Sequence, residues 1–337
     1  MREASSSRRP HIASIPLIPA SMFGVVLGLA GLANAWRAAH RVWGAPSVIA
    51  ESLFGIATIA WALITVLYAL KWLTAPDVAR AEAGHPVQCC FIGLAGVATL
   101  LIAQGADADA HGLATLLFVA GALFTLGFAV WRTGLLWRGE RSQTETTPVL
   151  YLPAVAGGFT VGATAAAFHW PDLGHLAFGA ALFSWLAIES VLLNRLYTSE
   201  SLPPALRPTL GIQLAPPAVG ASAYLALNPG APDVFAYALV GYALLQALLL
   251  IRMNGWIRQQ PFNVSYWAFT FGATALAGAS IQLAHDGSVF QTVLGLTVFA
   301  ATNVLVLSIG LGTLGLLLQG RILPRPPEAR PSESAQP

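Results

Sequence analysis

Long apolar runs separated by short polar stretches cover most of the 337-residue chain. A helix needs about 20 apolar residues to cross a bilayer, and ten such runs can be drawn. Their approximate limits are 17 to 37, 48 to 71, 87 to 105, 111 to 132, 149 to 168, 173 to 194, 208 to 227, 233 to 254, 262 to 284 and 290 to 319. The pattern predicts an all-α integral membrane protein with ten transmembrane helices and no room for a soluble domain.

The apolar runs are of two kinds that alternate along the chain. Odd-numbered runs begin at or near proline and are rich in glycine, whereas even-numbered runs carry more Leu, Phe, Trp and Tyr. Small residues let helix backbones approach closely in a membrane, so we expect the odd runs inside and the even runs facing lipid. The result is five helical hairpins around a central axis. The five inner helices then form either a pore or a solid bundle whose glycines only pack tightly.

The seventh run contains two adjacent prolines, Pro216 and Pro217, inside a stretch expected to be helical. An interior proline frees backbone carbonyls and kinks a helix. Irregular backbone at membrane depth persists only where it is buried in protein or lines a cavity. We therefore expect both prolines on an inner, kinked helix.

The ninth run mixes aromatic residues with residues of almost no volume. Because successive helical residues turn by about 100°, Phe269 and Phe271 point to nearly opposite sides. The side of Phe271 continues through Thr274, Gly278 and Gln282, which are small or polar. Phe271 is therefore a candidate plug in a pore, and an ordinary packing role for its ring is the alternative.

The composition agrees with a membrane protein and bears on its orientation. Hydrophobic residues make up 56% of the chain and charged residues only 9%, against about 25% charged in soluble proteins. The net charge of +2 gives no reason to expect a nucleic-acid partner. Positive residues are retained in the cytoplasm, and of the 17 Lys and Arg only Arg37 and Arg41 fall on the opposite side. The pattern predicts a multi-pass protein of a bacterial-type inner (plasma) membrane, with both termini cytoplasmic.

The polar ends of the chain define its domain organisation. Residues 1–15 are predicted to be a cytoplasmic segment ahead of a retained first helix, because that run has full membrane length and no small-residue cleavage site. Residues 16–320 form the predicted ten-helix membrane channel domain. Residues 321–337 are rich in proline and polar residues, which predicts a disordered cytoplasmic tail.

Residues that carry chemistry are few. A carboxylate inside a span is by default functional, and two stand out. Glu51 lies near the outer end of the second run, where a pairing with Arg41 is one option. Glu189 lies deeper, where a structural or subunit-interface role and a role in proton coupling both stay open. The histidines lie at run ends or in loops, Cys89 and Cys90 are adjacent instead of spaced, and no metal, phosphate-loop or catalytic motif stands out. We expect no cofactor, no metal and no enzyme activity.

Three segments resemble a known family of membrane proteins. They are the tract 206–220 with its Ala-Pro-Pro sequence, the tract 263–272 with Trp-Ala-Phe-Thr-Phe, and the His-Pro-Val sequence at 85–87. They resemble the tellurite-resistance and dicarboxylate transporter family, which includes bacterial TehA permeases and plant guard-cell slow anion channels. The resemblance covers about residues 16 to 319. It implies five hairpins around one pore per subunit, a homotrimer, and a pore occluded by the second aromatic residue of Phe-Thr-Phe, which is Phe271.

The inner runs favour weak binding of anions. Their central turns contain no Lys, Arg, Asp or Glu, and a fixed positive charge there would bind an anion too tightly to release it. Helix N-termini and hydroxyl groups give shallower wells. Together with the resemblance, this predicts a channel or uniporter that passes small inorganic or organic anions. A proton-coupled C4-dicarboxylate carrier or a sulfite or tellurite secondary transporter is the alternative, although a carrier of this kind needs a titratable group near its substrate.

The predicted site consists of a gate and a pore wall. The gate is Phe271. The predicted pore-lining residues are small, hydroxylated or kink-forming, namely Gly24, Gly28, Gly93, Gly96, Gly157, Gly158, Thr160, Pro216, Pro217, Gly220, Thr274 and Gly278.

Overall fold

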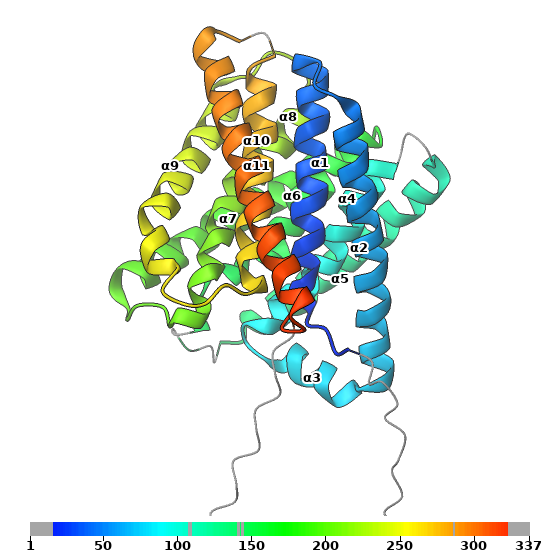
Figure 1. The fold of residues 1–337 in the computed structure, drawn as a ribbon, viewed down its shortest axis with the longest axis vertical. Helices are drawn as coiled ribbons and strands as arrows, with labels where there is room; N and C mark the ends of the chain where they lie inside the picture. The colour runs from blue at the N-terminus through cyan, green and yellow to red at the C-terminus, as the bar shows by residue number, and fades with distance from the viewer. Residues whose placement is uncertain (1–15, 107–109, 140–141, 143–144, 286, 323–337) are drawn as a thin grey trace, which may run out of the picture.

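The computed structural model describes residues 16–322, except 107–109, 140–141, 143–144 and 286. The predicted N-terminal segment 1–15 and residues 323–337 of the predicted tail lie outside the described residues. The described part consists of helices and connecting turns without a β-strand, and its long helices form one bundle (Figure 1). The all-α prediction is therefore confirmed.

Nine helices in the described ranges are long and apolar enough to cross a membrane, which identifies an integral membrane protein. They are Ala20–Trp43, Ser47–Thr74, Gln88–Ala106, His111–Leu136, Pro148–Ala167, Pro171–Thr198, Pro204–Leu227, Val234–Ile257 and Val289–Leu318. The predicted ninth run differs from these. There the chain forms a short 3₁₀ segment, η7 (Val264–Phe269), followed by the 14-residue helix α10 (Thr270–Leu283). The count of ten membrane-crossing helices stays a prediction.

The odd-numbered runs share one local structure, in which an irregular helical segment precedes an α-helix. These pairs are η1 (Ala20–Met22) with α1 (Phe23–Trp43), η2 (Gln88–Gly93) with α4 (Leu94–Ala106), η4 (Pro148–Leu150) and the π-helical η5 (Leu152–Ala156) with α6 (Gly157–Ala167), η6 (Pro204–Leu214) with α8 (Ala215–Leu227), and η7 with α10. Proline lies within or just before each irregular segment. Because proline lacks an N–H and crowds the preceding turn, the chain there adopts the tighter 3₁₀ pattern or a π bulge.

The even-numbered runs form long, uninterrupted helices. They are α2 (Ser47–Thr74), α5 (His111–Leu136), α7 (Pro171–Thr198), α9 (Val234–Ile257) and α11 (Val289–Leu318). Between α2 and η2 the chain adds a short helix that the apolar pattern does not predict, α3 (Pro76–Gly84). Its Glu82 receives a hydrogen bond of 2.8 Å from Lys71 Nζ, and Lys71 also donates to the backbone oxygen of Ile18. This buried ion pair ties α2 and α3 to the start of the first inner helix.

The prediction that Pro216 and Pro217 lie in the interior of an α-helix is wrong, and a kink at this point stays a prediction. The 3₁₀ segment η6 ends at Leu214, and α8 begins at Ala215, so both prolines lie in the first turn of the α-helix. A proline is accommodated there because its missing N–H has no intrahelical partner at that position. The irregular backbone lies directly before the prolines, in the turn that a proline crowds.

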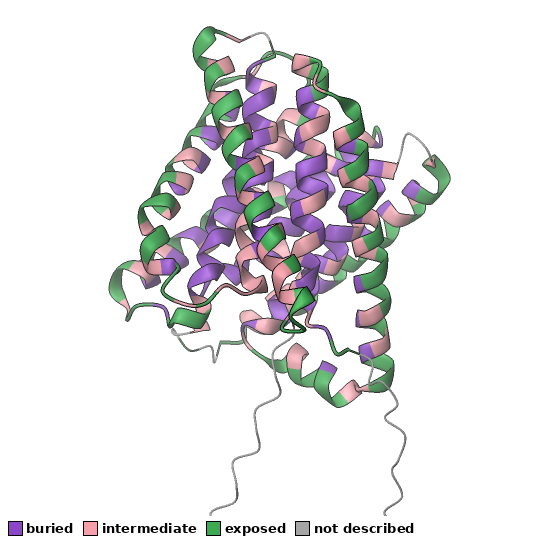
Figure 2. Cartoon of the chain, in the orientation of Figure 1, coloured by how far each residue is buried: buried purple, intermediate pink, exposed green. Residues whose placement is uncertain are grey.

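The alternation of inner and outer helices is confirmed. In the most apolar window of the spans that contain α1, α4, α6 and α8, between 61% and 78% of the residues are buried. In the spans formed by α2, α5, α7, α9 and α11 the share falls to between 17% and 28%. Figure 2 shows the buried residues gathered on the central helices and the exposed ones on the peripheral helices. The small residues thus belong to the interior, where backbones pack closely.

The inner helices form a closed ring. Around it, α1 contacts α4, α4 contacts α6, α6 contacts α8, α8 contacts α10, and α10 returns to contact α1. Each inner helix also packs against the outer helix that follows it in the chain, as α1 does with α2 and α10 with α11. The short helix α10 is therefore an essential member of the ring.

Candidate functional site

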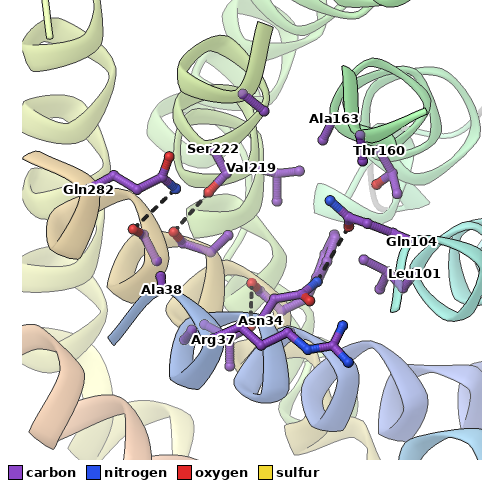
Figure 3. A pocket seen from close by; sticks show the side chains of 18 of the residues that line it. Asn34, Arg37, Ala38, Leu101, Gln104, Thr160, Ala163, Val219, Ser222 and Gln282 are labelled. Carbon is purple, nitrogen blue, oxygen red and sulfur yellow. Dashed lines mark hydrogen bonds between the residues drawn. The ribbon is translucent and has the colours of Figure 1, made fainter. Parts of the chain in front are cut away.

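A cavity of about 410 Å³ lies inside the ring and is lined by residues from all five inner helices (Figure 3). The lining residues are Gly31, Asn34, Ala35, Arg37, Ala38 and Arg41 of α1, Leu101 and Gln104 of α4, Thr160, Ala163 and Ala167 of α6, Val219, Ser222 and Ala226 of α8, and Phe271, Thr274, Ala275, Gly278 and Gln282 of α10. Small side chains predominate on this wall. The cavity exists because five small-residue helices meet there without bulky side chains to fill the space.

One face of α10 contributes the side chains noted in the sequence. Phe271, Thr274, Gly278 and Gln282 all line the cavity. Phe269 is not among the lining residues, and its ring stacks on a tyrosine of η7 with the ring centroids 6.1 Å apart. A Cβ atom at Gly278 would meet no atom within 4 Å, because that position faces the empty space.

The exposure of the lining residues changes along the cavity. Phe271, Val219 and Thr160 are buried, with 9%, 5% and 2% exposed. Arg41 and Ala226, the last lining residues of α1 and α8, are exposed. The distance from Phe271 to Gln282 along α10 is about 16 Å at the helical rise of 1.5 Å per residue. The mouth therefore lies at the C-terminal ends of the inner helices, and the lining is buried at the level of Phe271.

The wall between these two ends carries neutral polar groups. Asn34 Nδ2 donates a hydrogen bond of 3.4 Å to Gln104 Oε1, and Ser222 Oγ donates one of 3.0 Å to a backbone oxygen of α10. Gln282 Nε2 donates to the backbone oxygen of Gly278 at 3.3 Å, and Figure 3 shows these side chains around the same space. Each side-chain amide has a second N–H that can reach a ligand. Such a wall offers several weak donors and no strong charge.

Charge enters the lining only at the mouth. Among the described residues, Arg37 and Arg41 are the only charged side chains that line the cavity. The pairing of Glu51 with Arg41 raised from the sequence is wrong, because Glu51 binds Arg37 instead. Arg37 Nε lies 2.9 Å from Glu51 Oε1, and Arg37 Nη2 lies 2.6 Å from Glu51 Oε2.

Several predicted pore-lining glycines lie where helices touch. A Cβ atom at Gly28 would lie 2.3 Å from Oγ1 of Thr270, and one at Gly158 would lie 2.9 Å from a Cβ atom of α7. Gly93, Gly96 and Gly157 approach side chains of α5 equally closely. These glycines remove volume at the contact between neighbouring helices, which is why they do not line the cavity.

The predicted gate and pore-lining residues together divide into two groups. Phe271, Thr160, Thr274 and Gly278 line the cavity. The others are not among its lining residues, and their place on the pore wall stays a prediction. They are Gly24, Gly28, Gly93, Gly96, Gly157, Gly158, Pro216, Pro217 and Gly220.

Four lining residues were missed as members of the site although the sequence carries a signal for them. Asn34, Gln104 and Ser222 each place a polar side chain in the C-terminal half of an otherwise apolar inner run. Arg37 lies one turn further along the first run. A rule that singles out polar residues within inner runs, in addition to glycines, would have found all four.

Glu189 lies outside the cavity, where α7 meets Tyr151 between η4 and η5, the segment η6 and the helix α9. Its Oε2 accepts hydrogen bonds from two groups and its Oε1 from three. The donors are Tyr151 Oη, Trp185 Nε1 at 2.8 Å, Gln213 Nε2 at 2.9 Å, Tyr242 Oη at 2.6 Å and Gln246 Nε2 at 3.4 Å. No Lys or Arg contributes to these bonds. The carboxylate thus joins two neighbouring helix pairs through neutral donors.

Comparison with known proteins gives a consistent picture. A family profile described as voltage-dependent anion channel matches residues 18–314. A tellurite resistance protein TehA homolog from Haemophilus influenzae is 36% identical over 90% of this chain and 92% of its own length. The S-type anion channel SLAH2 of Arabidopsis thaliana is 23% identical over 91% of this chain and 60% of its own length. An uncharacterized transporter, MJ0576, from Methanocaldococcus jannaschii is 25% identical over 69% of this chain and 74% of its own length.

The match spans the whole ring of inner helices and the outer helices around it, so it concerns the fold that forms the cavity. The similarity suggested by the Ala-Pro-Pro and Trp-Ala-Phe-Thr-Phe tracts is confirmed, since TehA-like and plant S-type relatives both appear. With its apolar helices, this chain is a multi-pass membrane protein that belongs to the voltage-dependent anion channel family.

Proposed function

We propose that this chain is a membrane anion channel or uniporter, and that the cavity is one half of its permeation pathway, closed by Phe271. The observation that carries the proposal is that the five-helix ring encloses a cavity whose described lining is charged only at its mouth and includes the buried aromatic ring of Phe271. The family match and the anion channels among the relatives support the same function. Small inorganic or organic anions are the proposed substrates.

The lining explains how an anion would pass without being trapped. Conduction requires sites that attract an ion weakly enough to release it. Asn34, Gln104, Ser222 and Gln282 supply amide and hydroxyl groups along the path. No acidic side chain from the described residues lines the cavity to repel an anion. We therefore expect low affinity and a preference for anions that dehydrate easily.

The proposed architecture is five hairpins with ten membrane-crossing helices around one pore per subunit. The short segment formed by η7 and α10 counts as the ninth crossing because α10 contacts both α1 and α8 and so completes the ring. We further propose a homotrimer in a bacterial-type inner membrane with both termini cytoplasmic. The resemblance of the Phe-Thr-Phe region supports the trimer, and the distribution of Lys and Arg supports the orientation.

The gate is tested by replacing Phe271 with Ala. The protein, reconstituted in liposomes, is assayed by iodide entry that quenches an encapsulated dye. Loss of the ring should raise the flux several-fold, since the closed end would lose its largest side chain. Phe269→Ala is the matched control, because that ring is not among the cavity-lining residues. A folded Phe271→Ala protein with unchanged flux would exclude Phe271 as the gate.

The lining of the cavity also favours a uniporter over a proton-coupled carrier. A carrier of dicarboxylates would place a titratable group near its substrate, whereas the buried carboxylate of Glu189 is not among the lining residues. Nitrate and malate uptake, measured with and without a proton gradient at zero membrane potential, distinguishes the two. Strict dependence of malate uptake on the gradient would support the carrier.

A further inference from the structure

The mouth of the cavity carries two arginines that differ in their ion pairing. Arg37 and Arg41 lie one turn apart on α1, so their side chains lie on the same face of the helix. Both line the cavity, whereas Glu51 on the neighbouring helix α2 does not. The charge presented to an entering anion therefore depends on how each arginine is paired.

Arg37 is held by groups from three directions. Its Nε and Nη2 atoms bind the two carboxylate oxygens of Glu51 in a bidentate pair, and its Nη1 donates to the backbone oxygen of Gly105 at 3.2 Å. Its guanidinium also lies 4.7 Å above the ring centroid of Phe54. Bidentate pairing of this kind uses the same fork of N–H groups that would bind an external oxyanion.

Unlike Arg37, Arg41 forms no ion pair with a described acidic residue. It is exposed at the mouth. Glu51 is accessible as well, with 52% of its side chain exposed against 21% for Arg37. Among the described residues, an anion that approaches the mouth therefore meets Arg41 without an acidic partner, the neutralised Arg37 and the carboxylate of Glu51.

The partial charge of the helix ends adds to the effect of these side chains on an entering anion. The cavity opens at the C-terminal ends of the inner helices, where unpaired carbonyl groups give each helix a partial negative charge. That field opposes the entry of anions. Cationic side chains at this end offset it, so the balance between Arg37, Arg41 and Glu51 sets the attraction of the mouth for an anion.

We propose that Glu51 is a built-in counter-anion that masks Arg37, leaves Arg41 as the recruiting cation, and thereby sets the affinity of the mouth for small inorganic anions such as nitrate. The proposal rests on the proposed function, because it names the affinity-determining residues of the same pathway. Glu51 acts through Arg37 and is not itself a ligand for the anion.

The proposal is tested with Glu51→Gln, which keeps the length of the side chain and removes its charge. At low ionic strength the nitrate concentration for half-maximal flux should fall about two- to threefold, as Coulomb's law gives for one unit charge about 8 Å away in water. Arg41→Gln should raise it by a similar factor. In 1 M salt, where the screening length is about 3 Å, both shifts should vanish.

Two further variants separate a masking role from a structural one. Glu51→Asp retains the charge and should behave like the wild-type protein. In Glu51→Gln with Arg37→Gln, the gain should disappear because no cation is left to unmask. A salt-independent loss of flux in Glu51→Gln, restored by Glu51→Asp, would show that the pair only holds α1 against α2 and would overturn the proposal.

The experiment also distinguishes failure of this inference from failure of the proposed function. Nitrate binding is measured in parallel from the thermal stabilisation of the detergent-purified protein, a readout that needs no transport. Flux in the wild-type protein with no charge-dependent shift in either readout would refute the role of Glu51 alone. Absence of flux in the wild-type and Phe271→Ala proteins, with the binding shifts intact, would refute the channel and leave an anion site at the mouth.

Discussion

Substitution of Glu189 tests whether this buried carboxylate in a membrane-spanning helix has a structural role or a role in proton coupling. Replacement by Ala removes both acceptor oxygens and leaves Trp185 Nε1 and Tyr242 Oη without the bonds of 2.8 and 2.6 Å that they donate. The hydroxyl of Tyr151 also loses the oxygen to which it donates, whereas Gln213 is less affected because its Nε2 also donates to Tyr151 Oη at 3.1 Å. Trp185 and Tyr151 are both buried, and two buried donors that lose their acceptor cost about 2 to 6 kcal/mol in unfolding free energy. Replacement by Ala should therefore be severely destabilising.

Replacement by Gln should be tolerated. The indole N–H of Trp185 can only donate, so the remaining oxygen of the amide must face it. The new NH₂ group then faces Tyr242, whose hydroxyl can turn to accept, and Gln213, whose Oε1 has no hydrogen-bond partner among the described residues. A flip of the Gln213 amide supplies the missing acceptor. The variant exchanges charged hydrogen bonds for neutral ones, and we expect the free energy of unfolding to fall by about 1 kcal/mol.

Equilibrium unfolding in mixed micelles, followed by tryptophan fluorescence, measures both variants. Trp185→Phe is the control for a single lost donor and should cost about 1 kcal/mol. Equal destabilisation by Ala and Gln would show that the charge of Glu189, and not its acceptor geometry, holds the junction. Anion flux that becomes independent of pH only in Glu189→Gln would assign the residue to proton coupling and refute the structural account.

Three other sites give simpler tests. Gly105→Ala should destabilise the protein strongly in the same unfolding assay, because its Cβ would lie 1.8 Å from an aromatic ring of α2. Gly278→Ala, whose Cβ would point into the empty cavity, should leave stability unchanged and lower the iodide flux by narrowing the path; equal flux would place the path elsewhere. Lys71→Met should cost about 3 to 5 kcal/mol, since it leaves the carboxylate of Glu82 buried without its cation. Glu82→Gln should restore part of that loss in the double variant.

The inner and outer roles of the helices could be predicted because they depend on local composition. Glycine, alanine and proline in alternate runs indicate close backbone packing, and that signal needs no knowledge of which helices meet. The face of Phe271, Thr274 and Gly278 could be predicted for the same reason, since helical periodicity relates residues a few positions apart. The 3₁₀ segment ahead of α10 did not disturb this face because all three residues lie within the α-helix.

The polar partnerships could not be predicted because they connect residues far apart in the chain. Arg41 lies closer to Glu51 in the sequence than Arg37 does, yet Arg37 forms the ion pair. Four of the five donors of Glu189 lie outside α7, on Tyr151 between η4 and η5, on η6 and on α9, and nothing in the local pattern of α7 predicts them. The glycines were assigned to the pore wall for a related reason. A missing side chain opens space equally well toward a cavity or toward a neighbouring helix.

The position of Phe271 within its helix bears on how a gate could work. It is the second residue of α10, directly after the change from 3₁₀ to α-helical structure at Thr270. The chain passes from η7 into α10 without a break, and the backbone N–H of Thr270 donates to the backbone oxygen of Trp267. Thr270 Oγ1 donates to the backbone oxygen of Trp267 at 2.8 Å and ties the turn to η7. The proposed gate is thus attached at the point where 3₁₀ structure changes to α-helix, next to a residue that is held to η7 by two hydrogen bonds.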